Sequence, residues 1–227
     1  MLNDADRQRI AETVAKAEAA TTGEIVCVLA REVSNYREVP LGWAAAAALI
    51  IPPAAVWLGF SPWLLLPEGG GWSVGHVSAQ TWVIPSVVTA YSLLQAAIFV
   101  LVAFLVWIPQ VRRLLTPGTL KRHRVHKAAL EQFLATGLHT TGGRTGVVIF
   151  ASEHDRKVEI LADDLIHEKV GKDVWDAATQ AVVESVRRGR AADGFVRAVE
   201  ICGEALARHF PATGGRKNEL PDLPIEL

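Results

Sequence analysis

The sequence predicts a small α/β (α+β) sandwich that is interrupted by a transmembrane helical hairpin. Two long uncharged segments lie in the middle of the chain, whereas amphipathic helices and short apolar strands lie on both sides of them. The expected order is helix–strand–(transmembrane hairpin)–helix–strand–strand–helix–helix. The expected boundaries are 1–40 for the first part of the domain, 41–66 and 82–109 for the two transmembrane helices, 67–81 for the extracytoplasmic loop between them, 110–210 for the second part of the domain and 211–227 for an irregular tail.

Each uncharged segment is longer than the ~20 residues that a helix needs to cross a bilayer. Tryptophans stand near the ends of both, which is typical of the membrane interface: Trp43, Trp63, Trp82 and Trp107. The connecting loop has no Lys or Arg, whereas basic residues follow the second segment: Arg112, Arg113, Lys121, Arg122, Arg124 and Lys127. The positive-inside rule therefore predicts a multi-pass protein of the cell (inner) membrane, with both termini and the domain in the cytoplasm.

The same basic residues are candidates for contact with lipid headgroups. The alternative is that they set orientation and solubility only. No other partner follows from charge, because the net charge of −1 gives no reason to expect nucleic acid.

The helices and strands on either side of the apolar segments are predicted from hydrophobic periodicity and from capping and turn residues. A first helix begins at an Asn3 or Asp4 cap, and Gly23 is expected as its left-handed C-terminal residue. The other expected elements are strand 24–32, helix 120–137 ending at Gly137, a hairpin of strands 145–152 and 157–162, and helices 172–189 and 193–209. A single strand cannot form a sheet, so 24–32 is expected to pair with 145–152 across the insertion. Both halves must then lie on the same side of the membrane.

Two cysteines, Cys27 and Cys202, have no CxxC spacing. We expect both to be small buried residues in a reducing compartment rather than a disulfide or a nucleophile.

The segments TTGEIV, RTGVVIFASEHDRKVEILADDLI and AADGFVRAVEICGEAL, in this order, resemble the TPM domain family, most closely its membrane-embedded bacterial branch. The resemblance covers about 1–32 and 120–210. It implies a TPM-like fold. Family members include a thylakoid protein linked to acid phosphatase activity and an auxiliary receptor subunit, and some bind Ca²⁺ or Mg²⁺ at an acidic pocket near the strand ends.

This sequence departs from the family pattern just before strand 145–152. Many members have an Asp in a D-N-G turn there, whereas this chain has Gly143-Arg144-Thr145-Gly146. Replacing a carboxylate by a cation weakens the case for a metal site. The turn also lacks the spacing of a phosphate-binding loop.

Asp163, Asp164 and Asp193 are the candidate ligands for Ca²⁺ or Mg²⁺, which prefer several converging oxygens. The alternative is that these residues form turns and cap helices. Asp155 is expected at the opposite end of strand 157–162. His123 and His126 share a helix face and could hold zinc with a third ligand, but the neighbouring cations disfavour this.

No recognisable catalytic arrangement of Ser, His and Asp appears in the sequence. We therefore expect a membrane-anchored TPM-like module that binds or modulates a membrane or cytoplasmic protein. The alternative is a divalent-metal-assisted phosphatase. A homo-oligomeric pore is disfavoured because neither apolar segment carries a charge.

Overall fold

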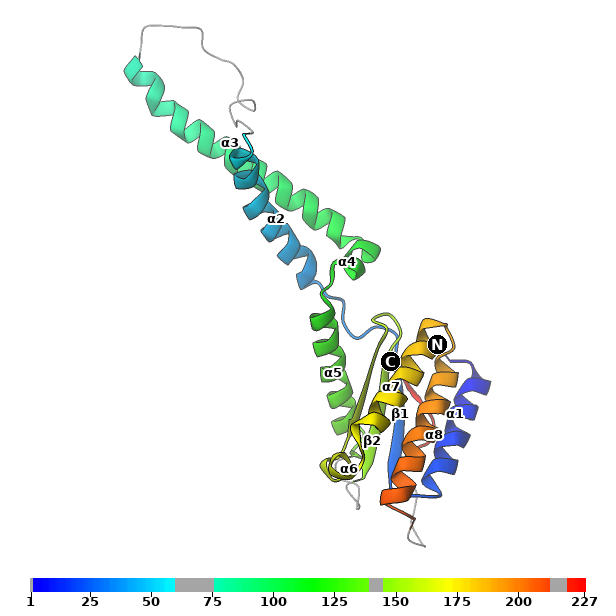
Figure 1. Cartoon of the computed structure of the whole chain (residues 1–227). Coiled ribbons are helices and arrows are strands. Elements are labelled where there is room, and N and C mark those ends of the chain that lie inside the picture. The colour runs from blue at the N-terminus through cyan, green and yellow to red at the C-terminus, as the bar shows by residue number, and fades with distance from the viewer. Residues whose placement is uncertain (1, 60–75, 139–144, 213–219) are drawn as a thin grey trace. The chain divides into compact units, whose positions relative to one another are not determined.

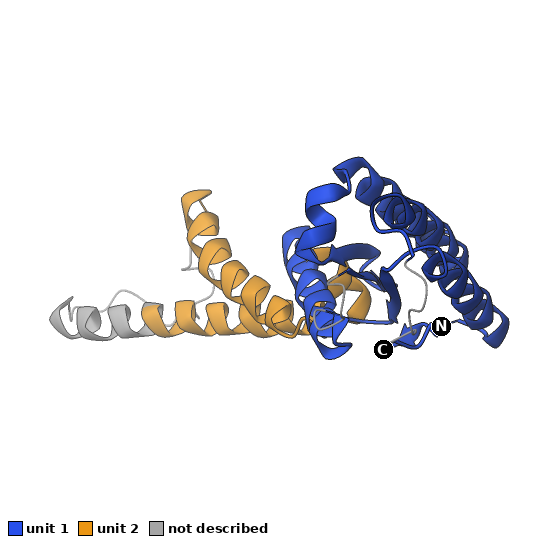
Figure 2. Cartoon of the chain, turned by 90° about the horizontal axis from the view of Figure 1, so that it is seen from below, with its two compact units in different colours: residues 1–35, 117–227 blue, residues 36–116 orange. Residues whose placement is uncertain are grey.

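The computed structural model describes residues 2–59, 76–138, 145–212 and 220–227, with the side chains of 76–87 left out. The chain forms two compact units (Figure 2). Unit 1 consists of residues 1–35 and 117–227, and unit 2 of residues 36–116.

Unit 1 is built on a four-stranded sheet of order β3-β2-β1-β4. β1 (Glu24–Ala30) and β2 (Gly146–Ser152) are parallel, with Glu24 opposite Gly146 and Ala30 opposite Ser152. This confirms the predicted pairing of two strands that lie on either side of the apolar segments. β3 (Lys157–Ala162) is antiparallel to β2, so the predicted hairpin is also confirmed.

Helices cover both faces of this sheet (Figure 1). α1 (Asp4–Glu18), α7 (Lys172–Arg187) and α8 (Ala191–His209) pack on one face, around side chains such as Ile25, Ile149 and Phe195. α5 (Gly118–Ala135) packs on the other face, where Val28, Phe150 and Phe133 meet. Every residue of β1 and β2 is buried, which explains why their sequences are continuous apolar runs rather than alternating ones.

The predicted cap of α1 is confirmed, because Asn3 Oδ1 accepts a hydrogen bond of 2.7 Å from the backbone N–H of Asp6. The prediction for Gly23 is wrong. α1 ends at Glu18, and Gly23 is not among the glycines with positive φ. Its role is close packing, since a Cβ there would lie 2.9 Å from Leu206 Cδ1 on α8. Gly137, with φ 74°, does follow α5 as predicted.

Three elements differ from the sequence expectation. A short helix, α6 (Asp164–Lys169), follows β3, and α8 begins two residues before the expected Asp193. The tail was expected to be irregular, but β4 (Ile225–Glu226) pairs in parallel with β1. Arg7 on α1 holds this strand, because its Nε donates to Glu226 Oε1 at 2.7 Å. This bond and the charge of Glu226 raise the pKa of Arg7.

Unit 2 contains α2 (Glu38–Trp57), α3 (His76–Trp107) and α4 (Pro109–Leu115). α3 begins earlier than the expected residue 82, and residues 60–75 of the expected span and loop lie outside the described residues. α2 packs on α3 through buried alanines, and Gln95 Nε2 donates to the Ala48 carbonyl at 3.2 Å. Small residues and interhelical hydrogen bonds of this kind are typical of helix pairs in membranes.

Two helices are long and apolar enough to cross a membrane, Glu38–Trp57 and Val88–Trp107. No residue in the most apolar 18-residue window of the second is buried, and 28% of the corresponding window of the first is buried. Large apolar side chains point outward from both helices, among them Leu49, Trp57, Val100 and Phe104.

Candidate functional site

A polar cavity of about 270 Å³ lies in unit 1 beside the carboxyl end of β1. α1 contributes Asp6 and Arg9 to its wall, the residue after β2 is Glu153, and the start of α8 contributes Asp193. Open α/β sheets bind ligands at the carboxyl ends of their parallel strands. This cavity is therefore the first candidate site.

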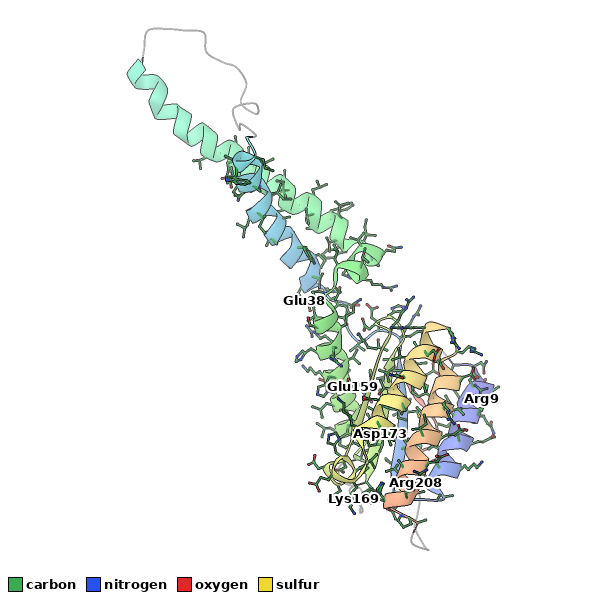
Figure 3. All side chains as sticks on the ribbon, viewed as in Figure 1. Arg9, Glu38, Glu159, Lys169, Asp173 and Arg208 are labelled. Carbon is green, nitrogen blue, oxygen red and sulfur yellow. The ribbon has the colours of Figure 1, made fainter. Side chains whose placement is uncertain are left out.

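The charges in this cavity neutralise one another. Arg9 Nη2 lies 2.6 Å from Asp193 Oδ1 and 3.4 Å from Asp6 Oδ1. Arg190 Nη1 lies 3.6 Å from the other oxygen of Asp193. Two guanidinium groups thus hold the Asp193 carboxylate, and a cation would have to displace them to bind there. Figure 3 labels Arg9 on α1, the blue helix.

The three predicted metal ligands do not come together. The backbone N–H of Asp163 donates to the Gly146 carbonyl at 3.0 Å, which places Asp163 beside the start of β2. Asp193 shares a cavity with Glu153, which follows the end of β2. At ~3.3 Å per residue, the six steps of β2 separate the two positions by about 20 Å. Within the described ranges no group of three His, Cys, Asp or Glu residues could hold a metal ion.

Asp163 instead caps α6. Its Oδ1 accepts a hydrogen bond of 3.1 Å from the backbone N–H of Asp164, which is the alternative role considered from the sequence. Asp155 lies in the β2–β3 turn, at the opposite end of β3 as predicted, and its Oδ2 accepts from Ser152 Oγ at 3.0 Å. One oxygen of each carboxylate therefore has a local structural partner, whereas the buried Oδ2 of Asp163 has no hydrogen-bond partner within the described residues.

The two histidines of α5 do not act as a pair in this structure. His126 Nδ1 lies 2.8 Å from Glu159 Oε1 on β3, and His123 is exposed. The contact joins α5 to the outermost strand of the sheet. Figure 3 labels Glu159, which lies between α5 and α7 in that view.

The predicted headgroup-contacting residues divide between two helices. Arg112 and Arg113 lie on α4, and the other four, Lys121, Arg122, Arg124 and Lys127, lie on α5. Lys127 Nζ is 3.8 Å from Glu131 one turn later. Arg122 lines a groove of unit 1, so lipid is not its only candidate contact.

That groove has a volume of about 410 Å³ and runs beside β3. Arg122 reaches it from α5, whereas Lys172, Trp175 and Asp176 reach it from α7. Since α5 and α7 cover opposite faces of the sheet, a space that both helices line must lie at the edge of β3. No sequence pattern predicts this site, because Trp175 occupies an ordinary core position of an amphipathic helix.

Both cysteines are free and buried, as predicted. Burial raises the pKa of Cys202 to about 12, and it raises the pKa of Cys27 as well, with smaller contributions from Cys202 and Glu18. Neither thiol is therefore an accessible nucleophile in the folded domain.

Residues 110–205 match the family model of the TPM domain. The chain carries a TPM domain. The match begins after the apolar helices, so β1 lies outside the matched residues although it occupies the middle of the sheet. No curated protein matches the sequence.

A solved structure that resembles this TPM protein is the NMR structure of the BA42 protein from the psychrophilic bacterium Bizionia argentinensis. The TM-score is 0.55, the sequence identity is 17%, and the alignment covers 100% of this chain and 95% of BA42. Together with the mixed sheet and its helices, this shows the expected α/β fold of the TPM class.

Proposed function

We propose that this TPM protein is anchored in the cell (inner) membrane by α2 and α3, and that its TPM domain binds another protein on the cytoplasmic side. The observation that carries the proposal is the outward apolar surface of α3, where residues such as Leu93, Val100 and Phe104 are more than half exposed. A core helix of a soluble protein buries such side chains, whereas lipid can cover them.

Two polar side chains of the hairpin donate hydrogen bonds within unit 2, which a bilayer favours. Gln95 donates to the Ala48 carbonyl. Trp43 Nε1 donates to the Leu115 carbonyl at 3.0 Å, close to the basic α4. A tryptophan beside basic residues is typical of a helix end at the membrane interface.

Reporter fusions test this anchoring. A reporter inserted at glycines 69–71 and another at the C-terminus are expected to read opposite sides of the membrane. Extraction with alkaline carbonate should leave the chain in the pellet, and detergent should release it. The same side for both reporters, or release by carbonate alone, would contradict the proposal.

The basic residues support the orientation and are proposed to contact anionic headgroups. Replacing Arg112 and Arg113 together by Glu removes two positive charges after α3 and adds two negative ones, and it is expected to weaken the preference for a cytoplasmic C-terminus. The matched control is the same double exchange at Arg187, the last residue of α7, and Arg188, its C-cap. If both double variants changed the membrane orientation equally, the position of the basic residues next to the apolar helix would be unimportant.

Binding, rather than chemistry, is proposed because the charged groups of the polar cavity are held in ion pairs with one another, as Arg9 and Asp193 are. Capture of the full chain from solubilised membranes should recover a partner in a fixed ratio. Recovery of the chain alone would count against a binding role.

A further inference from the structure

β3 is an outermost strand of the sheet, so one of its two edges faces away from β2. In an antiparallel ladder, alternate residues direct both backbone groups to the partner strand, and the residues between them direct both groups away. The bond from Asp163 N–H to the Gly146 carbonyl fixes this alternation. Leu161 and Glu159 therefore face β2, whereas Val158, Ile160 and Ala162 present their N–H and C=O groups outward.

The same three residues line the groove of about 410 Å³ beside the strand. No hydrogen bond of their outward backbone groups occurs among the described residues. Among the described residues no strand pairs with this edge, and residues of α5, α6 and α7 contribute side chains to the groove walls. An open row of backbone donors and acceptors is a template for another strand.

Trp175 provides an independent observation. It is the only tryptophan of unit 1, and it lines the groove from α7. Its Nε1 is buried, and within the described ranges it has no hydrogen-bond partner. A buried indole N–H normally donates to an acceptor. The groove therefore holds a donor that suits a carbonyl or carboxylate oxygen.

Two cations at the groove have no ion-pair partner in the described ranges and could each hold a carboxylate of an occupant. These are Arg122 and Lys172, and neither forms an ion pair within the described part of the chain. Of the two lining carboxylates, Glu159 Oε1 lies 2.8 Å from His126 Nδ1, and Asp176 forms no ion pair among the described residues. Both cations are therefore available to a carboxylate of an occupant.

We propose that an extended acidic segment of a partner protein adds to the outer edge of β3 as a fifth strand, with its backbone on Val158, Ile160 and Ala162 and a carboxylate near Arg122 and Lys172. This proposal rests on the proposed binding function and specifies its partner chemistry. Strand addition obtains affinity from main-chain hydrogen bonds and specificity from the flanking side chains.

A second copy of this chain fits the groove less well. Pairing β3 with another β3 would bring Glu159 as its only carboxylate, and His126 already holds that group. Arg122 and Lys172 would then stay without an ion-pair partner in both copies. Self-association is accordingly an outcome that the experiment must separate from partner binding.

The probe is a display library of random octapeptides, panned against the full-length protein in nanodiscs. Enriched peptides are expected to contain Asp or Glu and to protect the amides of Val158, Ile160 and Ala162 from hydrogen exchange. Val158→Pro removes one outward N–H and should weaken binding about ten-fold relative to Val158→Ala, which keeps the backbone donor.

Charge variants give a second readout that does not depend on the strand. Arg122→Glu and Lys172→Glu should each weaken binding several-fold. The control Arg208→Glu, at an exposed site on α8, should leave affinity unchanged. Protection of Cys27 and Cys202 from alkylation shows which variants are folded. If Val158→Pro is unfolded, the charge variants test the proposal in its place.

Three results would overturn the inference: no enriched peptide, equal binding to Val158→Pro and Val158→Ala, or protection at amides other than those of β3. Self-association through β3 without peptide binding would also overturn it. A native partner that is still captured by folded Val158→Pro and Arg122→Glu proteins would leave the binding function intact and reject this site alone.

Discussion

Replacing Gly194 by alanine tests the packing of α8 on α7. A Cβ at this position would lie 2.8 Å from Ser185 Cβ and 2.9 Å from Val182 Cα. Non-bonded carbons prefer ~3.5–4.0 Å, so the two helices must separate by up to ~1 Å. Val182 Cα belongs to the backbone and cannot turn aside. Overpacking of this kind costs about 1–3 kcal/mol of unfolding free energy.

Gly118→Ala is the matched control. Gly118 also lies in the first turn of a helix, α5, but its added Cβ would meet no atom within 4 Å. Both substitutions gain the same intrinsic helix preference of up to ~1 kcal/mol. The difference between the two variants therefore isolates the clash at the α7–α8 contact.

Thiol alkylation measures this difference in intact membranes. Cys27 and Cys202 are the only cysteines of the chain, and both are buried in unit 1. Labelling requires the domain to open, so its rate follows the opening free energy. A difference of about 1–3 kcal/mol corresponds to about 5–150-fold faster labelling of Gly194→Ala than of Gly118→Ala. Equal labelling rates of the two variants would show that α7 and α8 leave room for a Cβ at Gly194.

Four other perturbations have defined outcomes. The pKa of Cys202 is raised to about 12 in the folded protein. The protonated thiol therefore stabilises the fold fully below the ordinary thiol pKa, and this contribution is lost as pH rises toward 12. Above about pH 9 the melting temperature of Cys202→Ala should therefore fall less steeply with pH than that of the unaltered protein. Gln95→Leu removes the bond to the Ala48 carbonyl and should lower the stability of the α2–α3 hairpin by about 0.6 kcal/mol in an SDS titration, with no loss as the contradicting result. Asp163→Ala removes the α6 cap and should cost about 1 kcal/mol. Mg²⁺ or Ca²⁺ should not raise the melting temperature of the unaltered protein, and a rise that disappears in Asp163→Ala would restore the metal site.

Much of the fold follows from local sequence patterns. The apolar runs at β1 and β2 predicted buried strands, and the need of β1 for a neighbour predicted its pairing with a strand more than a hundred residues away. The periodic helices α7 and α8 were also predicted, because their apolar residues recur at helical spacing. β4 was missed because two residues in a Pro-rich tail carry no periodicity, and the bond from Arg7 that holds it is formed between distant segments.

The candidate sites were harder to predict, since they depend on which strand ends coincide. Asp163 and Asp193 were grouped because both are acidic and flank apolar elements. Their positions at opposite ends of β2 follow only from the register Gly146–Asp163 and from the packing of α8. The groove at β3 depends on an unpartnered indole N–H and on edge backbone groups, neither of which a sequence reveals.

The parallel pairing of β1 has a consequence for synthesis of the protein. Both neighbours of β1, β2 and β4, come later in the chain, and the first of them begins at Gly146. At 5–20 residues per second, a ribosome needs roughly 6–25 s to travel from Ala30 to that point. During this interval seven consecutive residues that the finished domain buries have no strand beside them. Nascent chains of this protein should therefore depend on holding chaperones, and a slower ribosome should lengthen that dependence.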